Sequence, residues 1–152
     1  MIVAAVFVVM VPVVVLAATS GTMSSQVNRQ LGVWRNSPIS TTSMSFRSVP
    51  GLGARICATG EVSVTVSLEG TGGPMGVLVL VDNGPTSAPG AVRFMPKGDA
   101  DSASFTFFQN TSAFEANDHH FFDVEWRSPF GAKTTLLEAT MNLVYQKGTH
   151  AC

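Results

Sequence analysis

Strict alternation of apolar and polar residues between positions 61 and 69 constrains the fold of this chain more than any other feature of its sequence. The segment reads EVSVTVSLE, so one face carries the apolar side chains Val62, Val64, Val66 and Leu68. The other face carries the hydroxyls of Ser63, Thr65 and Ser67. Side chains alternate between the two faces of a β-strand, whereas a helix needs an apolar period near 3.6 residues. The pattern therefore predicts a strand with one face in a core and the other toward water.

Five further segments carry strand signals, and residues that favour turns separate them. They are residues 76–81, 91–95, 102–109, 120–127 and 134–146. The first is apolar throughout, as expected of a strand buried on both faces. The last two alternate, and their predicted inward residues are Phe122, Val124 and Trp126, then Leu137, Ala139, Met141, Leu143 and Tyr145. No helical period appears after residue 50, so we predict an all-β, antiparallel sandwich or barrel over residues 56–152.

Residues 19–55 are polar and irregular, and we interpret them as an approach segment that leads into the β domain. A short helix is expected over residues 24–31. Trp34 and Phe46 are the aromatic residues of residues 19–50, and we expect both to dock onto the body of the domain.

Charged side chains are scarce in all 152 residues. Nine Lys and Arg residues and ten Asp and Glu residues make up 12% of the chain, about half the usual share of roughly 25%. A net charge of −1 excludes a strongly basic nucleic-acid binder, because such proteins need clustered cations to neutralise phosphates. The scarcity of charge also lowers the electrostatic barrier to self-association, so it favours an oligomer.

The N-terminal residues 1–18, MIVAAVFVVMVPVVVLAA, contain no polar side chain. Their length is near that of a membrane-spanning helix, and the small residues that follow Leu16 suit cleavage by signal peptidase. Three interpretations stay open: a cleaved secretory signal, a retained membrane anchor or filament-assembly helix, and a buried element of the fold. The first two place the domain outside the cell or at its surface, with membrane contact only if residues 1–18 are retained.

The chain has two cysteines, Cys57 and Cys152. An even number behind an export segment predicts one structural disulfide between them. Such a bridge would close a loop of about 95 residues and stabilise the fold by up to about 4–5 kcal/mol. A bond between the terminal cysteines of two chains is the alternative.

Other chemistry-bearing residues gather around residue 120. Adjacent His119 and His120 invite a metal site with Asp118, but neighbouring residues of a strand point to opposite faces, so we predict no metal. Asp123, Glu125 and Arg127 share one strand face. An acid–base pair is one reading of this face, but we prefer a solvated face or an oligomer interface, with Arg127 paired to Glu125 or to a cross-strand partner.

Asn110 begins an Asn-Thr-Ser sequon and is a candidate glycosylation site. The sequence contains no nucleophile elbow, phosphate-binding loop or dinucleotide fingerprint. We therefore predict no catalytic residue and no cofactor.

Residues 110–147 have a recognisable order of features. The segment NDHHFFDVEWR contains His120, Phe122, Val124 and Trp126 at alternating positions and Arg127 directly after them, and a Gly-containing turn and a final strand follow it. This segment resembles the closing hairpin of TNF/C1q-like jelly-roll domains, which occur in secreted proteins and in viral or phage fibre heads. Asp118 stands where that family has Gly. The resemblance implies a jelly-roll sandwich, often trimeric, that acts by binding or assembly.

We therefore expect a secreted or surface-displayed, non-enzymatic structural or adhesive module, oligomeric, with an extracellular ligand. A membrane-anchored or pilin-type filament subunit that uses residues 1–35 for assembly is one alternative. A secreted enzyme on a sandwich scaffold is the other.

Overall fold

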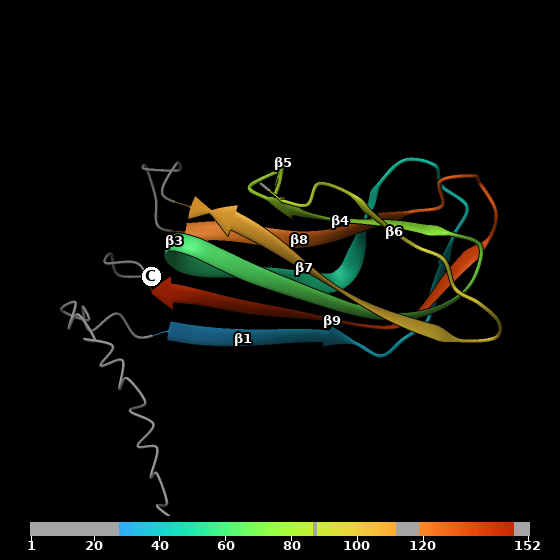
Figure 1. The fold of residues 1–152 in the computed structure, drawn as a ribbon, viewed down its shortest axis with the longest axis horizontal. Coiled ribbons are helices and arrows are strands. Elements are labelled where there is room, and N and C mark those ends of the chain that lie inside the picture. Colours follow the sequence, from blue (N-terminus) through green and yellow to red (C-terminus); the bar gives the residue numbers. More distant parts are fainter. Residues whose placement is uncertain (1–27, 87, 112–118, 148–152) are drawn as a thin grey trace, which may run out of the picture.

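The computed structural model describes residues 28–86, 88–111 and 119–147, which form antiparallel β-sheet without an α-helix (Figure 1). Its strands are β1 (Asn28–Arg35), β2 (Ile39–Thr41), β3 (Arg47–Gly72), β4 (Met75–Val81), β5 (Gly84–Pro85), β6 (Val92–Phe94), β7 (Asp101–Asn110), β8 (His119–Arg127) and β9 (Thr134–Lys147). Each of the six segments predicted as strands lies within or overlaps one of these. The expected helix over residues 24–31 is wrong for residues 28–31, which begin β1.

Strand β3 is 26 residues long and organises the sheet because it changes partners along its length. Its first part, Arg47 to Cys57, pairs with β8, and its second part, from Ala58 onward, pairs with β9 and β7. The pairing with β9 shifts register between Thr59 and Ser63. Gly60 lies in this interval with φ of 76°, which is a conformation that glycine adopts without strain.

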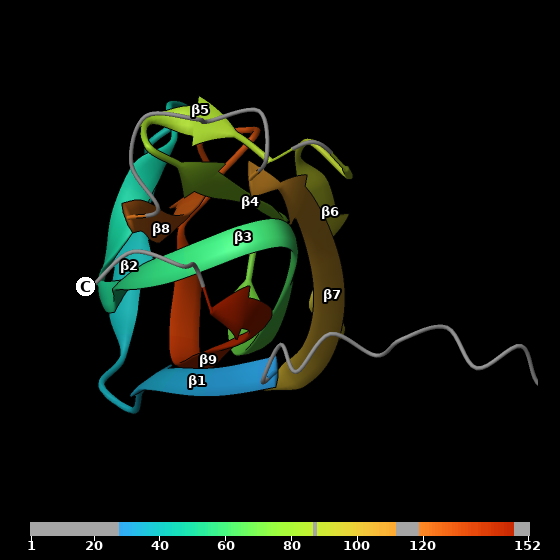
Figure 2. The ribbon, with the colours of Figure 1, turned by 90° about the vertical axis from the view of Figure 1, so that its left-hand side faces the viewer.

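The path of hydrogen-bonded neighbours runs β1-β9-β3-β8-β4-β5. Strand β2 also pairs with β9, β6 with β4, and β7 with β3. Figure 2 shows β3 passing between β8 above it and β9 below it. The segment predicted as a closing hairpin is therefore not a hairpin, because β8 and β9 pair with opposite parts of β3 and not with each other.

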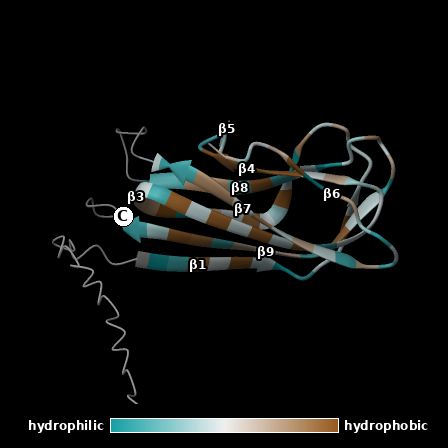
Figure 3. Cartoon of the chain, viewed as in Figure 1, coloured by the Kyte–Doolittle hydropathy of each residue, from teal (hydrophilic) through white to brown (hydrophobic). Residues whose placement is uncertain are grey.

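A single hydrophobic core collects the inward faces of the long strands. The alternation predicted for residues 61–69 is confirmed, since Val62, Val64, Val66 and Leu68 are all buried. Phe122, Val124 and Trp126 of β8 are also buried, as predicted. The alternating bands of apolar and polar residues along β3 and β9 are visible in Figure 3. Each large side chain removed from water stabilises the fold by about 1.5–3 kcal/mol.

Strand β9 departs from the predicted inward face at its beginning. Leu136 is buried, and Leu137 is half-buried on the other side of the strand. The cause is a register shift opposite Glu69 and Gly70, which inserts an extra residue into β9 and reverses the alternation there. From Ala139 to Leu143 the predicted face is again the buried one.

Part of the sequence lies outside the described residues. The apolar segment 1–18 belongs to it, so its three interpretations stay open. Within the described ranges, no helix is long and apolar enough to cross a membrane.

Candidate functional site

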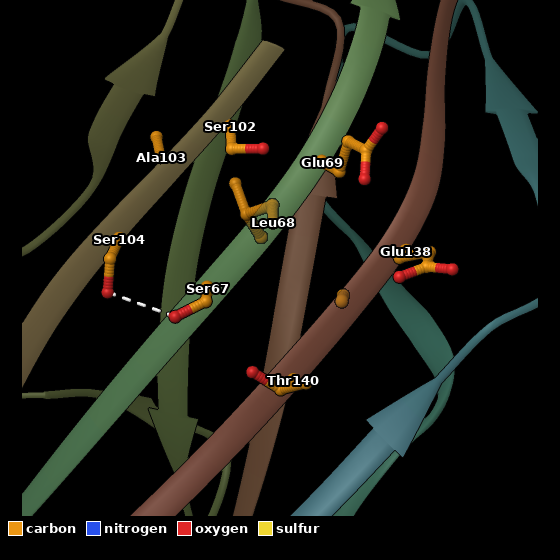
Figure 4. Close-up of a pocket in the computed structure, with 9 residues that line it drawn as sticks. Ser67, Leu68, Glu69, Ser102, Ala103, Ser104, Glu138 and Thr140 are labelled. Atoms are coloured by element: carbon orange, nitrogen blue, oxygen red, sulfur yellow. Dashed lines mark hydrogen bonds between the residues drawn. The ribbon is translucent and has the colours of Figure 1, made fainter. Parts of the chain in front are cut away.

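An open groove of about 450 Å³ lies on the outward face of the sheet where β7, β3 and β9 run side by side (Figure 4). It is lined by Ser67, Leu68, Glu69, Ser102, Ala103, Ser104, Glu138, Ala139 and Thr140. The alternation that sends Val66 and Leu68 into the core sends Ser67 and Glu69 outward. The same pattern that builds the core therefore sets hydroxyls and carboxylates along the groove.

Strand register arranges these polar groups in rows across the sheet. In the first row Ser67 lies between Ser104 of β7 and Thr140 of β9. The Oγ atoms of Ser67 and Ser104 are 3.0 Å apart and share a hydrogen bond. In the next row Glu69 lies between Ser102 and Glu138. The groove therefore has a hydroxyl row followed by a row that holds two carboxylates.

Glu69 and Glu138 are directly opposite each other on neighbouring strands. Like charges in this position destabilise a sheet by about 0.2–1 kcal/mol. Among the described residues that line the groove there is no Lys, Arg or His to compensate them. The pair therefore concentrates negative charge and strong hydrogen-bond acceptors at one end of the groove.

Trp34 stands beside the hydroxyl row. It pairs in register with Thr140, so the two side chains project from the same face of the sheet. Its side chain is 71% exposed. The expectation that Trp34 docks onto the domain is therefore wrong. Alternation within β1, where Leu31 and Val33 pack toward the core, is the signal that would have placed Trp34 outward.

The face predicted from Asp123, Glu125 and Arg127 lies elsewhere, on β8. Asp123 accepts a hydrogen bond from Ser48 Oγ. Burial raises the pKa of Glu125, and the negative charge of Asp123 raises that pKa further. Arg127 and Glu125 do not form the expected ion pair in the part of the chain that the structure describes. An oligomer interface on this face stays a prediction.

Arg127 instead stacks its guanidinium group 4.4 Å from the centre of the Phe46 ring. Its Nη1 donates a hydrogen bond to the carbonyl of Met44 at 3.4 Å. Phe46 is half-buried, as expected of a residue that docks onto the body of the domain. The contact with an aromatic ring takes the place of the expected carboxylate partner.

His119 and His120 point to opposite sides, as strand geometry predicts: His119 is exposed and His120 is buried. His120 Nδ1 lies 2.8 Å from Asp82 Oδ2, and Asp82 Oδ1 accepts a hydrogen bond from the Phe121 amide. This pair ties the start of β8 to the turn after β4. No group of three metal-ligating side chains occurs among the described residues, and Asp118 lies outside them.

Two further predicted positions are described only in part. Cys57 is buried in β3, and its Sγ lies 3.6 Å from His119 Nδ1. Cys152 lies outside the described residues, so their disulfide stays a prediction. Asn110 ends β7 on an exposed face, and the neighbouring Thr111 donates a hydrogen bond to the Gly60 carbonyl at 2.8 Å. Glycosylation of Asn110 also stays a prediction.

No family model matches the chain, and no curated protein matches it.

Proposed function

We propose that this chain is a non-enzymatic, exported binding module that holds a carbohydrate in the groove beside Trp34. The observation that carries the proposal is the row of hydroxyls and the uncompensated carboxylate pair next to an exposed tryptophan ring. An unpaired like-charge contact costs stability, so its presence in a charge-poor chain favours a role in binding.

The chemistry of the groove suits a neutral sugar. Sugar rings present several hydroxyls that both donate and accept hydrogen bonds, and the Ser and Thr hydroxyls complement them. Glu69 and Glu138 accept hydrogen bonds that are strengthened by their charge. The face of Trp34 offers an apolar surface for the C–H side of a sugar ring. Hydroxyls, carboxylates and an aromatic ring together recognise a polyhydroxylated ligand better than an apolar or strongly anionic one.

We further propose that the fold is a jelly-roll sandwich of the TNF/C1q-like kind. Nested strand pairing supports this: β1 pairs with β9, the first part of β3 with β8, the second part of β3 with β7, and β4 with β6. In this arrangement the chain folds back about its middle, and the two parts of β3 belong to different sheets. The proposed sandwich then has two four-stranded sheets, β1-β9-β3-β7 and β3-β8-β4-β6. The resemblance of strand β8 to the corresponding strand of that family supports the same proposal, although β8 and β9 do not form a hairpin.

Export, the Cys57–Cys152 disulfide and self-association belong to the same proposal. The apolar segment 1–18 supports export, and the low charge supports an oligomer. The filament alternative requires residues 1–35 for assembly, although residues 28–35 are strand β1 in the sheet. The enzyme alternative would require turnover of the bound sugar.

The test is binding of the full chain to a panel of neutral oligosaccharides, followed by titration of the best ligand. Trp34→Ala is expected to weaken binding about tenfold or more, because an aromatic contact and its buried area are lost. Phe130→Ala is the matched control, since Phe130 is also exposed, at 66%, but lies in the turn after β8.

Trp34 also supplies a direct signal, because the other tryptophan, Trp126, is buried. Ligand binding should change the fluorescence of the full chain but not that of Trp34→Ala. Equal affinity of the Trp34 and Phe130 variants would contradict the proposal. Hydrolysis of the ligand would contradict its non-enzymatic part.

A further inference from the structure

A second hollow, of about 400 Å³, opens on the other part of the sheet, over strands β8, β4 and β6. Gly76 of β4 pairs with Arg127 of β8 on one side and with Arg93 of β6 on the other. Directly opposite residues project from the same face, so both arginines rise from one row with only a glycine between them. We call this row, Arg127, Gly76 and Arg93, the arginine cradle. Its two arginine Cα atoms are roughly 10 Å apart, twice the spacing of neighbouring strands.

Gly76 provides the room in the cradle. A Cβ atom at this position would lie 3.1 Å from Arg127 Cγ and 3.2 Å from Arg127 Nε. The Arg127 side chain therefore lies across Gly76, in the direction of β6. Gly76 is not among the glycines with positive φ, so its backbone conformation does not require glycine. An added Cβ atom would also lie 3.6 Å from Phe46 Cζ, and the Arg127 side chain would have to shift by a few tenths of an ångström to admit it.

Aromatic rings hold both guanidinium groups. Arg127 Cζ lies 4.4 Å from the centre of the Phe46 ring, and Arg93 Cζ lies 5.3 Å from the centre of the Phe130 ring. Cation–π contacts of this kind position the cations and leave their charge uncompensated. The site is thus preorganised, which lowers the entropy lost when a ligand binds.

The charge of the cradle is unmatched. None of the described residues that line the hollow is acidic, and neither arginine forms an ion pair within the described part of the chain. Arg127 Nε is buried and has no hydrogen-bond partner.

We propose that the arginine cradle binds a tetrahedral oxyanion, namely a sulfate or phosphate group. Each planar guanidinium group donates two parallel hydrogen bonds to a pair of oxygens. Two guanidinium groups on either side of a hollow match a tetrahedral anion, whose four oxygens can accept hydrogen bonds from both. A carboxylate has only two oxygens and can pair with only one of the guanidinium groups. This site lies on different strands from the carbohydrate groove and does not depend on it.

The experiment titrates the full chain with inorganic sulfate and inorganic phosphate in low-salt buffer, with acetate as the planar carboxylate. Saturable binding of sulfate or phosphate, tighter than acetate by about tenfold, is expected. Gly76→Ala keeps both charges but displaces the Arg127 side chain that lies across Gly76, so it should weaken the binding about tenfold or more. Arg93→Ala, at an exposed residue that does not threaten folding, should do the same.

Arg55→Gln is the matched control, because it removes one exposed positive charge from β3 at the far end of β8 and should leave binding unchanged. Equal loss in Arg55→Gln, or no loss in Gly76→Ala and Arg93→Ala, would overturn the proposal. Tighter binding of acetate than of sulfate or phosphate would also overturn it. A sulfated sugar and its unsulfated parent distinguish a sulfate ester from the free ion as the ligand. If the ester is the ligand, the sulfated sugar should bind more tightly than both its parent and inorganic sulfate, and Gly76→Ala should remove this difference.

Discussion

Glu69 and Glu138 illustrate how a single pair of residues connects stability with the proposed binding role. They face each other in register without a cation in the groove, so they repel each other in the folded chain. The unfolded chain separates them. The pair therefore costs folding free energy that a ligand with hydroxyl donors would recover.

Replacing one of the two carboxylates tests this at the residue scale. Glu138→Gln should raise the free energy of unfolding by about 0.2–1 kcal/mol, because the repulsion is removed. The same substitution should weaken binding of the groove ligand, because a charged acceptor is lost. Urea unfolding of the full chain measures the first effect, and titration measures the second.

Glu61→Gln is the control for this prediction. Glu61 is also exposed on β3, but its partner on β7 is the neutral Asn110. Its substitution should change stability by less than the Glu138 variant does. Equal stabilisation by both would mean that general negative charge, and not the opposed pair, is responsible.

At the scale of the element, β3 decides the architecture, because it pairs with β8 in its first part and with β9 and β7 in its second. Gly60 follows the change of partner, and its positive φ lies within the register shift of the pairing with β9. A residue with a Cβ atom is strained in this conformation even where space is available.

Gly60→Ala should therefore lower the free energy of unfolding by about 1–2 kcal/mol. An added Cβ atom would meet only Gln146 Oε1, at 4.0 Å, so crowding contributes little and the cost is conformational. Gly90→Ala is the control, because nothing lies within 4 Å of its Cβ position and its φ is not positive. Chemical unfolding that gives the same loss for both variants would contradict the role of Gly60.

At the scale of the whole molecule, a net charge of −1 opposes association only weakly. We expect the full chain in nonionic detergent, and the chain without residues 2–18, both to sediment as a homotrimer. The reason is that the proposed jelly-roll associates through its own faces, whereas a filament subunit needs its apolar segment. A monomeric species after deletion would contradict the trimer and favour assembly through residues 1–18.

Local pattern accounts for what was predictable from the sequence. Alternation predicts that Val62, Val64, Val66 and Leu68 lie in the core and that His119 and His120 point to opposite sides, and the structure confirms both. Alternation failed at Leu137, because a bulge depends on which strand lies opposite. The polar residues around Trp34 favour an approach segment, whereas the structure places Trp34 in the edge strand β1.

The sequence by itself determined the class of structure, the core residues and the polarity of the outward faces. These follow from a period of two, which acts between near neighbours in the chain. Only the tertiary structure decided which outward residues meet. Glu69 opposes Glu138, Trp34 stands beside Thr140, and Gly76 separates two arginines because of strand order and register. Register depends on contacts between residues far apart in the chain, and those contacts form only when the whole sheet folds.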